Sequence, residues 1–486
     1  MTAIKDIKPT ELWSIFHEMT QIPRPSFHEE KIQDWAVNFG KKLGLETIKD
    51  EVGNVIIRKP ATEGMENRKG IIFQGHLDMV PQKNSDKQHD FTTDPIEAFI
   101  DGEWVTANGT TLGADNGIGV SSALAVLASK TIKHGPVEVL LTATEETGMD
   151  GAKGLKAGIL QGDILLNTDT EDEGTFSIGC AGGIDVTATF KNKLTKKLPK
   201  KSTAFTLKIT GLKGGHSGVD IHLGRGNANK VFFRILKEIS CKSDVRLADI
   251  QGGSLRNAIP REAFGLIIVK SKKAEKIMAK VAELAETIKT ELENVEPNLA
   301  IELEAAEMPK KIMSKSLQNN LTNAVWAAPN DVVRMSDTMP GTVETSSNLA
   351  IVKSSKNKVE INCLVRSFSE STKLALASRL ESVFSLAGAC VTLDGSYPGW
   401  KPDVNSEILE VMKKLYYKQF KKKPELLAMH AGLECGILGA TYTNWDMVSI
   451  GPTIKYPHSP DEKVNIATVQ KYWDFLLNVL ENVPEK

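Results

Sequence analysis

Two adjacent acids follow an apolar run in the stretch LLTATEETGMDG, residues 140–151. The run predicts a buried strand, and the carboxylates of Glu145 and Glu146 stand just after it. Like charges side by side repel each other, and at the edge of a core they also lose solvation. Other acids and histidines stand at the ends of apolar runs or in loops beside them: His76, Asp78, Asp115, Asp169 and His458.

Neutral imidazoles and carboxylates, without a thiolate, suit zinc or similar divalent ions in a hydrolytic site. If Asp115, Glu146 and Asp169 bind metal, they bring three negative charges. Two divalent ions bring four positive charges, and a hydroxide bound between them brings the total charge to zero. Adjacent side chains of a strand point to opposite faces, so one glutamate of the pair is expected to bind metal while its neighbour faces the substrate. The sequence therefore predicts a binuclear metal centre that removes the repulsion within the pair.

Each of these residues also has an interpretation without function. A pair of glutamates is more often a solvated turn, and a single histidine is more often a hydrogen-bonded loop residue than a ligand. The metal hypothesis depends on several such residues standing at strand ends, where α/β sheets bind their ligands. Spacing alone leaves open whether Asp115 and His458 lie together. Three further histidines stand in polar stretches and are predicted to lie at the surface: His89, His134 and His222.

The elements that must position these residues alternate between helix and strand in the first 185 residues. Apolar residues at helical spacing predict helices at 10–22, 27–43 and 116–129. Short apolar runs predict strands at 54–59, 70–77, 137–144 and 163–169. Alternating helices and strands favour an α/β sheet that is covered on both faces. The same style returns after Trp400.

The middle of the chain differs in style. The basic stretch KNKLTKKLPKKS, residues 191–202, predicts a solvated linker, and strands and helices follow it in an α+β order. The order recurs, since GGSLRNAIP precedes one strand and ETSSNLAIV precedes its counterpart, which predicts an internal duplication. We therefore expect a discontinuous catalytic, metal-binding domain of residues 1–186 and 399–486, with an inserted domain of residues 187–398.

Composition limits the class of partner. Lys and Arg number 60 and Asp and Glu 61, so the net charge of −1 gives no support to a nucleic-acid or anionic-membrane partner. The five cysteines are scattered without a Cys-x-x-Cys pair, which indicates neither a disulfide framework nor a thiolate zinc site. No stretch predicts a signal peptide or a membrane span. The sequence therefore predicts a cytoplasmic protein with no membrane partner.

The chain resembles a known family over nearly its whole length. The motifs that carry the resemblance are GHLDMV, GADNGIG, TATEETGMDGAKGL, NTDTEDEG, GGHSGVDIHLGRGNA, MHAGLECG and PHSPDE. They are similar to those of the aminoacyl-histidine dipeptidases, also called peptidase D or carnosinase-like, in the clan of binuclear zinc exopeptidases and deacylases. The resemblance implies a zinc-exopeptidase-like α/β catalytic domain with an inserted α+β lid domain.

The resemblance also implies a role for each residue of the metal centre. It implies two divalent metal ions, zinc in the first place, with manganese or cobalt as alternatives. Asp115 would bridge them, and the remaining ligands would be His76, Glu146, Asp169 and His458. Asp78 would accept the ring N–H of His76 and so fix the tautomer of that ligand.

Catalysis and substrate binding would fall to further residues of the same motifs. Glu145 would be the general base that takes a proton from the metal-activated water and passes it to the leaving amine. His216 of GGHSG would stabilise the oxyanion once the lid has closed. Asn257 and Arg366 would bind the substrate carbonyl and the C-terminal carboxylate, and the backbone of Gly432 would line that end.

The function implied is a metal-dependent dipeptidase that hydrolyses short peptides, Xaa-His and other unblocked dipeptides among them. The alternative is an N-acyl-amino-acid deacylase or aminoacylase with the same binuclear centre. The two functions differ in the substrate, because a dipeptidase pocket receives a free α-amine and a deacylase pocket receives an N-acyl group. A third alternative is a protein that keeps the fold only for binding, without catalysis. Loss of Glu145, Asp78 or a metal ligand would favour this alternative, and all of these residues are present. Small peptides are the expected partners, and a homodimer is compatible with the sequence but not required by it.

Overall fold

The computed structural model describes residues 3–241 and 243–486, which form two compact units. Unit 1 comprises Met1–Cys180, Trp400–Ala428 and Leu433–Lys486. Unit 2 comprises Ala181–Gly399 and Met429–Gly432. Unit 1 is thus assembled from segments that are far apart in the sequence. The catalytic and lid roles of the two predicted domains, with their ranges, remain predictions.

Unit 1 is built on an eight-stranded mixed sheet. In spatial order its strands are β1 (Glu46–Lys49), β2 (Val55–Lys59), β6 (Val137–Thr142), β3 (Ile71–His76), β7 (Ile164–Asn167), β23 (Asp446–Ser449), β8 (Thr175–Cys180) and β22 (Glu425–Met429). The four strands from β6 to β23 are parallel, so their carboxyl ends meet at one edge. Every residue of β3 and β6 is buried, as expected for parallel strands that are covered on both faces.

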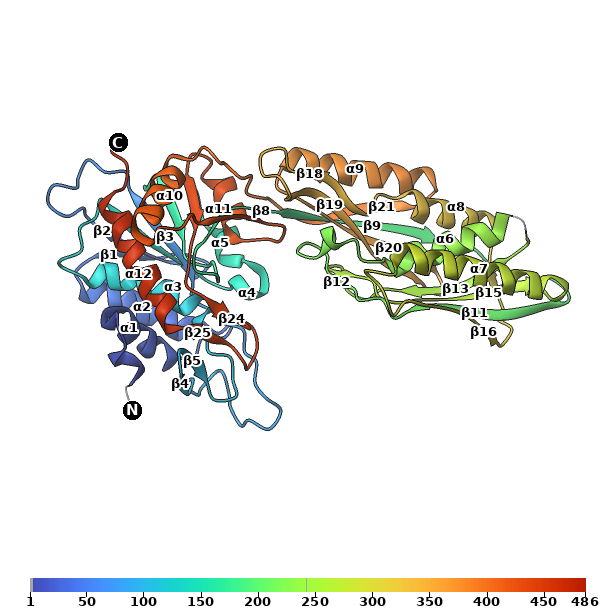
Figure 1. Cartoon of the computed structure of the whole chain (residues 1–486), viewed down its shortest axis with the longest axis horizontal. Coiled ribbons are helices and arrows are strands. Elements are labelled where there is room, and N and C mark those ends of the chain that lie inside the picture. Colours follow the sequence, from blue (N-terminus) through green and yellow to red (C-terminus); the bar gives the residue numbers. More distant parts are fainter. Residues whose placement is uncertain (1–2, 242) are drawn as a thin grey trace. The chain divides into compact units, whose positions relative to one another are not determined.

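Helices pack around this sheet. They are α1 (Thr10–Thr20), α2 (Glu30–Lys42), α3 (Ala114–Ala128), α4 (Glu145–Gly148), α5 (Asp150–Gly154), α10 (Glu407–Phe420), α11 (Glu434–Thr441) and α12 (Ile466–Glu481), with a short 3-10 helix, η1 (Ile4–Asp6). The helix α1 packs on α3, and α3 packs on β3 (Figure 1). Residues 114–127 of α3 are all buried, which fits the small and apolar residues that make up most of this segment.

A small antiparallel sheet joins the C-terminal loop of unit 1 to the segment that precedes α3. Its strands are, in spatial order, β24 (Ile454–Lys455), β25 (Lys463–Asn465), β5 (Trp104–Ala107) and β4 (Ala98–Asp101). Pairing of β24 with β25, and of β25 with β5, fixes both ends of the loop between β24 and β25. This loop contains His458.

Unit 2 is built on one antiparallel sheet. In spatial order its strands are β16 (Ala300–Ala306), β11 (Ser202–Thr210), β15 (Ala263–Lys270), β13 (Arg246–Gly252), β19 (Val343–Ser354), β20 (Lys358–Ser367), β9 (Gly182–Lys191) and β21 (Cys390–Tyr397), with β18 (Asp331–Met335) paired to β19. Two short strand pairs lie outside it, β10 (Leu194–Thr195) with β17 (Ile312–Met313), and β12 (Gly215–His216) with β14 (Ala258–Ile259).

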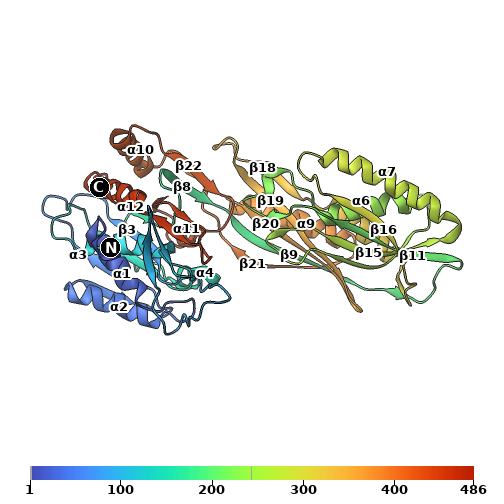
Figure 2. The same cartoon turned by 60° about the horizontal axis from the view of Figure 1, so that its bottom comes forward.

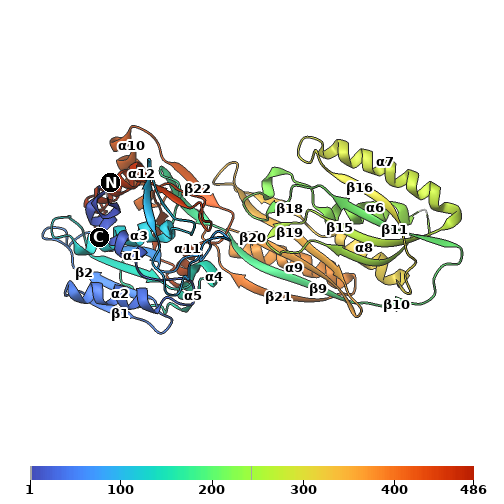
Figure 3. The ribbon, with the colours of Figure 1, turned by 90° about the horizontal axis from the view of Figure 1, so that it is seen from below.

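Four helices bury their apolar faces in the core of unit 2. They are α6 (Ala228–Cys241), α7 (Ala274–Leu292), α8 (Lys315–Ala327) and α9 (Glu370–Leu386), and two short 3-10 helices, η2 (Ile221–Leu223) and η3 (Ser271–Lys273), lie in the connections. The long helix α7 runs beside β16 (Figure 2), and α9 packs on β9 and β20 (Figure 3). The predicted α+β character of the inserted region is confirmed.

The two halves of the unit 2 sheet share a strand order. One half reads β13, β15, β11, β16 and the other reads β19, β20, β9, β21. In each half a helix precedes the first strand of the order, and a second helix leads to the last. This agreement supports the predicted internal duplication, which remains a prediction.

The strand-alternation argument for the glutamate pair is wrong. The strand β6 ends at Thr142, and Glu145 and Glu146 lie in the short helix α4. Thr144 has the left-handed backbone conformation, with φ 54°, so the chain turns before the pair. The pair therefore lies on a helical turn and not on a pleated strand, so strand alternation does not set the directions of the two side chains. Within the described part of the chain, no helix has both the length and the apolar character needed to cross a membrane.

Candidate metal centre

The five predicted metal ligands come together in unit 1, at the edge where its parallel strands end. His76 is the last residue of β3, and Asp169 follows β7 by two residues. Glu146 lies in α4, Asp115 is the second residue of α3, and His458 lies between β24 and β25. Because neighbouring parallel strands end at one edge, residues far apart in sequence meet there.

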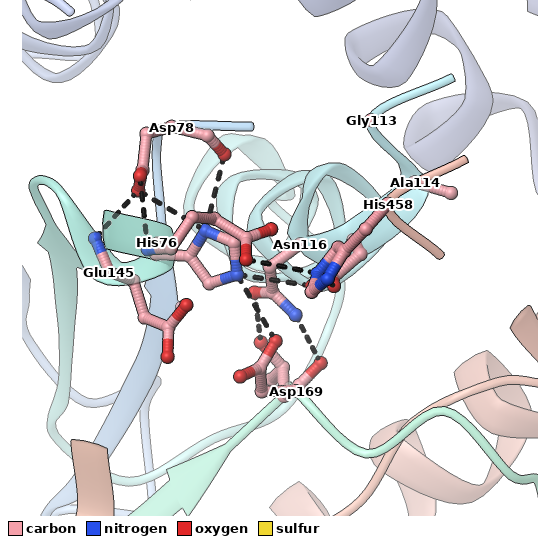
Figure 4. A network of polar contacts seen from close by, with 12 residues as sticks. His76, Asp78, Gly113, Ala114, Asn116, Glu145, Asp169 and His458 are labelled. Atoms are coloured by element: carbon pink, nitrogen blue, oxygen red, sulfur yellow. Dashed lines mark hydrogen bonds and ion pairs between the residues drawn. The ribbon is translucent and has the colours of Figure 1, made fainter. Parts of the chain in front are cut away.

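Asp115 lies between the two histidines. Its Oδ1 atom is 3.1 Å from Nε2 of His76, and its Oδ2 atom is 3.2 Å from Nε2 of His458. Oδ1 of Asp169 is 3.4 Å from the same nitrogen of His76, and Oε2 of Glu146 is 3.0 Å from the same nitrogen of His458. The residues therefore form two groups that share Asp115, and Figure 4 shows these contacts around His76, Asp169 and His458.

Carboxylate oxygens of this set lack the partners that buried polar atoms usually have. Oε1 of Glu146 and Oδ1 of Asp169 are buried without a hydrogen-bond partner among the described residues. One ligand atom from each of His76, Asp115 and Glu146 lies within 4.8 Å of the others. A buried carboxylate oxygen without a donor is costly unless a cation binds it. The residues present therefore fit divalent cations, with one carboxylate shared between two ligand groups.

The pKa values of both histidines and of some carboxylates in the centre are strongly shifted. Burial raises the pKa of Asp169 to about 7. Burial lowers the pKa of His76, but the carboxylates of Asp169 and Asp115 outweigh it and raise this pKa well above its ordinary value. Hydrogen bonds to Asp115 and Glu146 raise the pKa of His458 to about 11. A proton on either histidine would hold the same carboxylates that a metal ion would bind, so metal binding is expected to release protons.

Asp78 connects His76, a predicted metal ligand, to the helix α4. Its Oδ1 atom accepts a hydrogen bond from the backbone N–H of Glu145 at 3.0 Å, and its Oδ2 atom accepts one from that of Glu146 at 3.2 Å. Oδ2 also accepts a hydrogen bond from Oγ of Ser26, at 2.8 Å. Oδ1 lies 3.4 Å from Nδ1 of His76, on the ring side opposite the other ligands (Figure 4). Such a contact orients the imidazole and leaves Nε2 free for a metal.

The Glu145 side chain has no fixed partner. No hydrogen bond or ion pair to its carboxylate is present within the described residues, and Figure 4 draws a contact only at its backbone N–H. Burial raises the pKa of this carboxyl well above its ordinary value, and nearby carboxylates add to the effect. A carboxylate with these properties is a candidate proton acceptor.

The four other predicted residues lie in unit 2. His216 is the second residue of β12, and Nδ1 of its ring accepts hydrogen bonds from the backbone N–H groups of Gly218 and Val219, at 3.2 and 3.1 Å. A neutral ring must then carry its proton on Nε2, and burial together with the charge of Arg366 lowers the pKa of His216, which favours the neutral form. His216 is therefore a candidate hydrogen-bond donor.

Arg366 lies next to His216 in unit 2. Its Nη2 atom is 3.5 Å from Nε2 of His216, its Nε atom donates to Oγ of Ser217 at 3.4 Å, and its Nη1 atom donates to the hydroxyl of Tyr397 at 2.9 Å. The side chain is only 5% exposed, yet no carboxylate forms an ion pair with it in the described part of the chain. The guanidinium of Arg366 and the Nε2–H group of His216 are thus two neighbouring donors without an acceptor between them, an arrangement that suits an anionic ligand.

Asn257 and Gly432 complete the predicted set. Asn257 is exposed, and its backbone carbonyl accepts a hydrogen bond from the N–H of Ser217 at 2.8 Å. Because Ser217 follows His216 directly, this bond brings the backbone of Asn257 close to that of His216. Gly432 belongs to the segment Met429–Gly432, whose His430 has its Nε2 2.8 Å from Oγ of Ser346.

Several supporting residues escape sequence reasoning. Ser26, Ser217 and Tyr397 act through hydrogen bonds to other site residues, and Arg24 and Glu462 act through bonds to the backbone. Such bonds leave no pattern of type and spacing in a single sequence. The only signal for Glu462 is that it shares the PHSPDE motif with His458.

Histidine and carboxylate groups at the carboxyl ends of an α/β sheet are typical of zinc-dependent hydrolases. The chain belongs to Peptidase family M20/M25/M40, whose family model matches residues 72–482. The predicted family resemblance and fold class are thereby confirmed.

The chain is similar over its full length to proteins that are named dipeptidases. The cytosol non-specific dipeptidase of Escherichia coli (strain K12) is 49% identical over 486 residues, which cover 100% of both chains. The crystal structure of aminoacylhistidine dipeptidase from Vibrio alginolyticus is 50% identical, with a TM-score of 0.96, and the match covers 100% of this chain and 99% of that one. The aminopeptidase PepT from Bacillus cereus ATCC 10987, 17% identical with a TM-score of 0.58 over 98% and 99% of the two chains, shares the fold.

Proposed function

We propose that the protein is a metal-dependent dipeptidase that hydrolyses short unblocked peptides, Xaa-His dipeptides among them. The observation that carries the proposal is the position of Asp115, whose two carboxylate oxygens face two separate ligand groups. Full-length similarity to two proteins named as dipeptidases supports this substrate class over N-acyl amino acids. The retained carboxylates of Asp78 and Glu145 argue against a fold kept for binding alone.

Two divalent ions would be held by His76 with Asp169 on one side, by His458 with Glu146 on the other, and by Asp115 between them. We propose zinc as the native metal, with manganese or cobalt as alternatives, because imidazole and carboxylate ligands suit all of these ions. When bound, such ions supply Lewis acidity to a peptide carbonyl and make a water more acidic.

The protein's own groups carry the proton. Glu145 accepts a proton from the attacking water and delivers it to the leaving amine, because its carboxylate is free of other partners and its pKa is raised by burial. Asp78 acts through the N–H groups of α4 and the ring of His76, so it positions both the base and a ligand. The Nε2–H group of His216 donates a hydrogen bond to the developing oxyanion.

Arg366 binds the C-terminal carboxylate of the dipeptide in this proposal. Its buried guanidinium has hydroxyl partners but no carboxylate partner among the described residues. Asn257 and the backbone of Gly432 are proposed to contact the substrate carbonyl and the same C-terminal end. The E. coli relative is named as a cytosol protein, and we extend that location to this protein as part of the proposal.

The substrate class is tested by a panel of small compounds at fixed protein and metal concentration. Ala-His, Gly-His and Ala-Leu are expected to be hydrolysed after addition of Zn²⁺, Mn²⁺ or Co²⁺, whereas N-acetyl-alanine and N-acetyl-methionine are expected to react far more slowly. Release of amino acids is measured by chromatography. Faster turnover of the N-acetyl compounds would assign the protein to the deacylases and reject the proposal.

Replacing Arg366 by alanine is expected to raise KM for Ala-His by about 10- to 100-fold, because a hydrogen bond to a charged group contributes roughly 1.5–3 kcal/mol. A lysine at this position keeps the charge but loses the forked geometry, so its effect should be intermediate. A dipeptide with an amidated C-terminus should show little difference between the variant and the wild type. An equal loss for the free and the amidated substrate would contradict the role of Arg366.

A further inference from the structure

A buried glutamate binds the backbone of the turn that carries Asp115. The carboxylate of Glu462 accepts four backbone hydrogen bonds, from the N–H groups of Leu112 and Gly113 to Oε2 at 2.8 and 2.9 Å, and from those of Ala114 and Asp115 to Oε1 at 2.7 and 3.3 Å. The side chain is only 2% exposed. Both carboxylate oxygens are thus used entirely by consecutive backbone groups of one turn.

The local backbone explains why four N–H groups converge. Gly113 has φ 73° and ψ 31°, the left-handed conformation that glycine adopts without strain, and it stands at the N-terminus of α3. Consecutive N–H groups around such a residue form a concave anion site, and the first turn of a helix adds positive potential. Without an anion these N–H groups would be buried and unpaired, and their positive potential would lie beside a proposed cation site.

Glu462 also belongs to the loop that carries His458. The two residues are four positions apart, between β24 and β25. The backbone of Glu462 is itself anchored, because its N–H donates to the carbonyl of Ser459 at 3.0 Å and its carbonyl accepts from Oγ1 of Thr106 at 2.8 Å. One side chain therefore joins the turn of Asp115 to the loop of His458.

A buried cation fixes the same turn from its carbonyl side. Nη2 of Arg24 donates to the carbonyl of Gly113 at 2.5 Å, and Nη1 donates to the carbonyls of Leu77 and Asp78, at 2.9 and 3.1 Å. The turn is thus held by an anion at its N–H groups and by a cation at its carbonyl. The rigid attachment leaves the Asp115 side chain free to face the histidines.

We propose that Glu462 is a positioning residue that sets the separation of Asp115 and His458, and so determines how tightly the centre binds divalent ions. It acts through the backbone and touches neither the substrate nor the proposed ions. This inference rests on the proposed function, because it takes Asp115 and His458 as ligands.

The test is the Zn²⁺ affinity of a Glu462→Gln variant, measured by competition with a chromogenic chelator on protein freed of metal. Glutamine keeps the size of the side chain, but it loses the charge and places an NH₂ group against backbone N–H donors. Partners that orient metal ligands contribute about 10- to 100-fold to affinity, and a loss of this size is expected here. An affinity within twofold of the wild type would overturn the proposal.

Glu138 offers a matched control in the same unit. It is a buried glutamate that accepts backbone hydrogen bonds from Gln161 and Gly162, at 2.7 and 2.8 Å, but it lies at the opposite end of β6 from the centre. Glu138→Gln is expected to lower the unfolding temperature of the metal-free protein without changing Zn²⁺ affinity. Equal loss of affinity in both glutamine variants would reduce the role of Glu462 to general stability and reject the proposal.

Two further variants make the outcome decisive. If Glu462→Gln is not folded, Glu462→Asp replaces it, because aspartate keeps the charge but is too short to reach all four N–H groups. A weakening of about tenfold relative to Glu138→Asp, the lower end of what such partners contribute, is then expected. Asp115→Asn tests the proposed function separately. If Asp115→Asn leaves Zn²⁺ binding unchanged, the proposed centre is wrong. If it weakens binding while the Glu462 variants do not, only the positioning role is wrong.

Discussion

Replacing Glu145 by glutamine is expected to lower kcat for Ala-His by about 10²- to 10⁴-fold, the usual contribution of a general base. The amide keeps the shape of the side chain and cannot accept the proton of the attacking water. Metal content should stay at the wild-type level, because the carboxylate of Glu145 makes no contact within the ligand groups. Steady-state kinetics and metal analysis of the same preparation measure both quantities.

The neighbouring residue provides the control for this prediction. Glu146→Gln removes a negative charge whose oxygen lies 3.0 Å from Nε2 of His458, so it is expected to weaken metal binding by about tenfold or more. Its kcat should recover in part at high metal concentration, and that of Glu145→Gln should not. Identical behaviour of the two variants in metal titration and turnover would contradict the division of roles between them.

Replacing His216 by alanine is expected to lower kcat by about 10²- to 10³-fold with little change in KM, since an oxyanion donor acts in the transition state more than in substrate binding. The argument rests on the tautomer, because the N–H groups of Gly218 and Val219 occupy Nδ1 and leave the proton on Nε2. Metal content should not change. Steady-state kinetics with Ala-His measure the effect.

His222 is the matched control for this variant. It is an exposed histidine of unit 2 in the short helix η2 (Ile221–Leu223), and the proposed function gives it no role. His222→Ala is expected to retain wild-type kcat. A His216→Ala protein with near wild-type kcat would refute the assignment of the oxyanion donor.

The ends of the strands could be predicted from the sequence because an apolar run is a local pattern, and the alternation of such runs with helices indicates a parallel sheet. The runs before His76 and Asp169 correspond to β3 and β7, which are neighbours in the sheet. The meeting of Asp115 with His458 could not be predicted in this way. The two residues belong to segments more than 300 residues apart, which are joined by pairing of β25 with β5 and by the hydrogen bonds of Glu462.

Two errors show where local pattern fails. The pair that follows β6 was expected on a strand, but the left-handed residue Thr144 turns the chain into α4. His134 was expected at the surface because its neighbours in sequence are polar, but it is fully buried, with Nδ1 2.7 Å from the carbonyl of Gly135. Burial of a loop depends on which segments pack over it, and sequence neighbours carry no information about that packing.

In the proposed function, Asp115 lies at the middle of a dipeptidase centre that binds two metal ions. The most direct test is titration of metal-free protein with Zn²⁺ while hydrolysis of Ala-His is followed. Activity is expected to be absent without metal and to reach its maximum at two ions per chain, and Asp115→Asn should show neither the full activity nor the second equivalent. Full activity without metal, saturation at one ion per chain, or two bound ions without hydrolysis of any unblocked dipeptide would contradict the account.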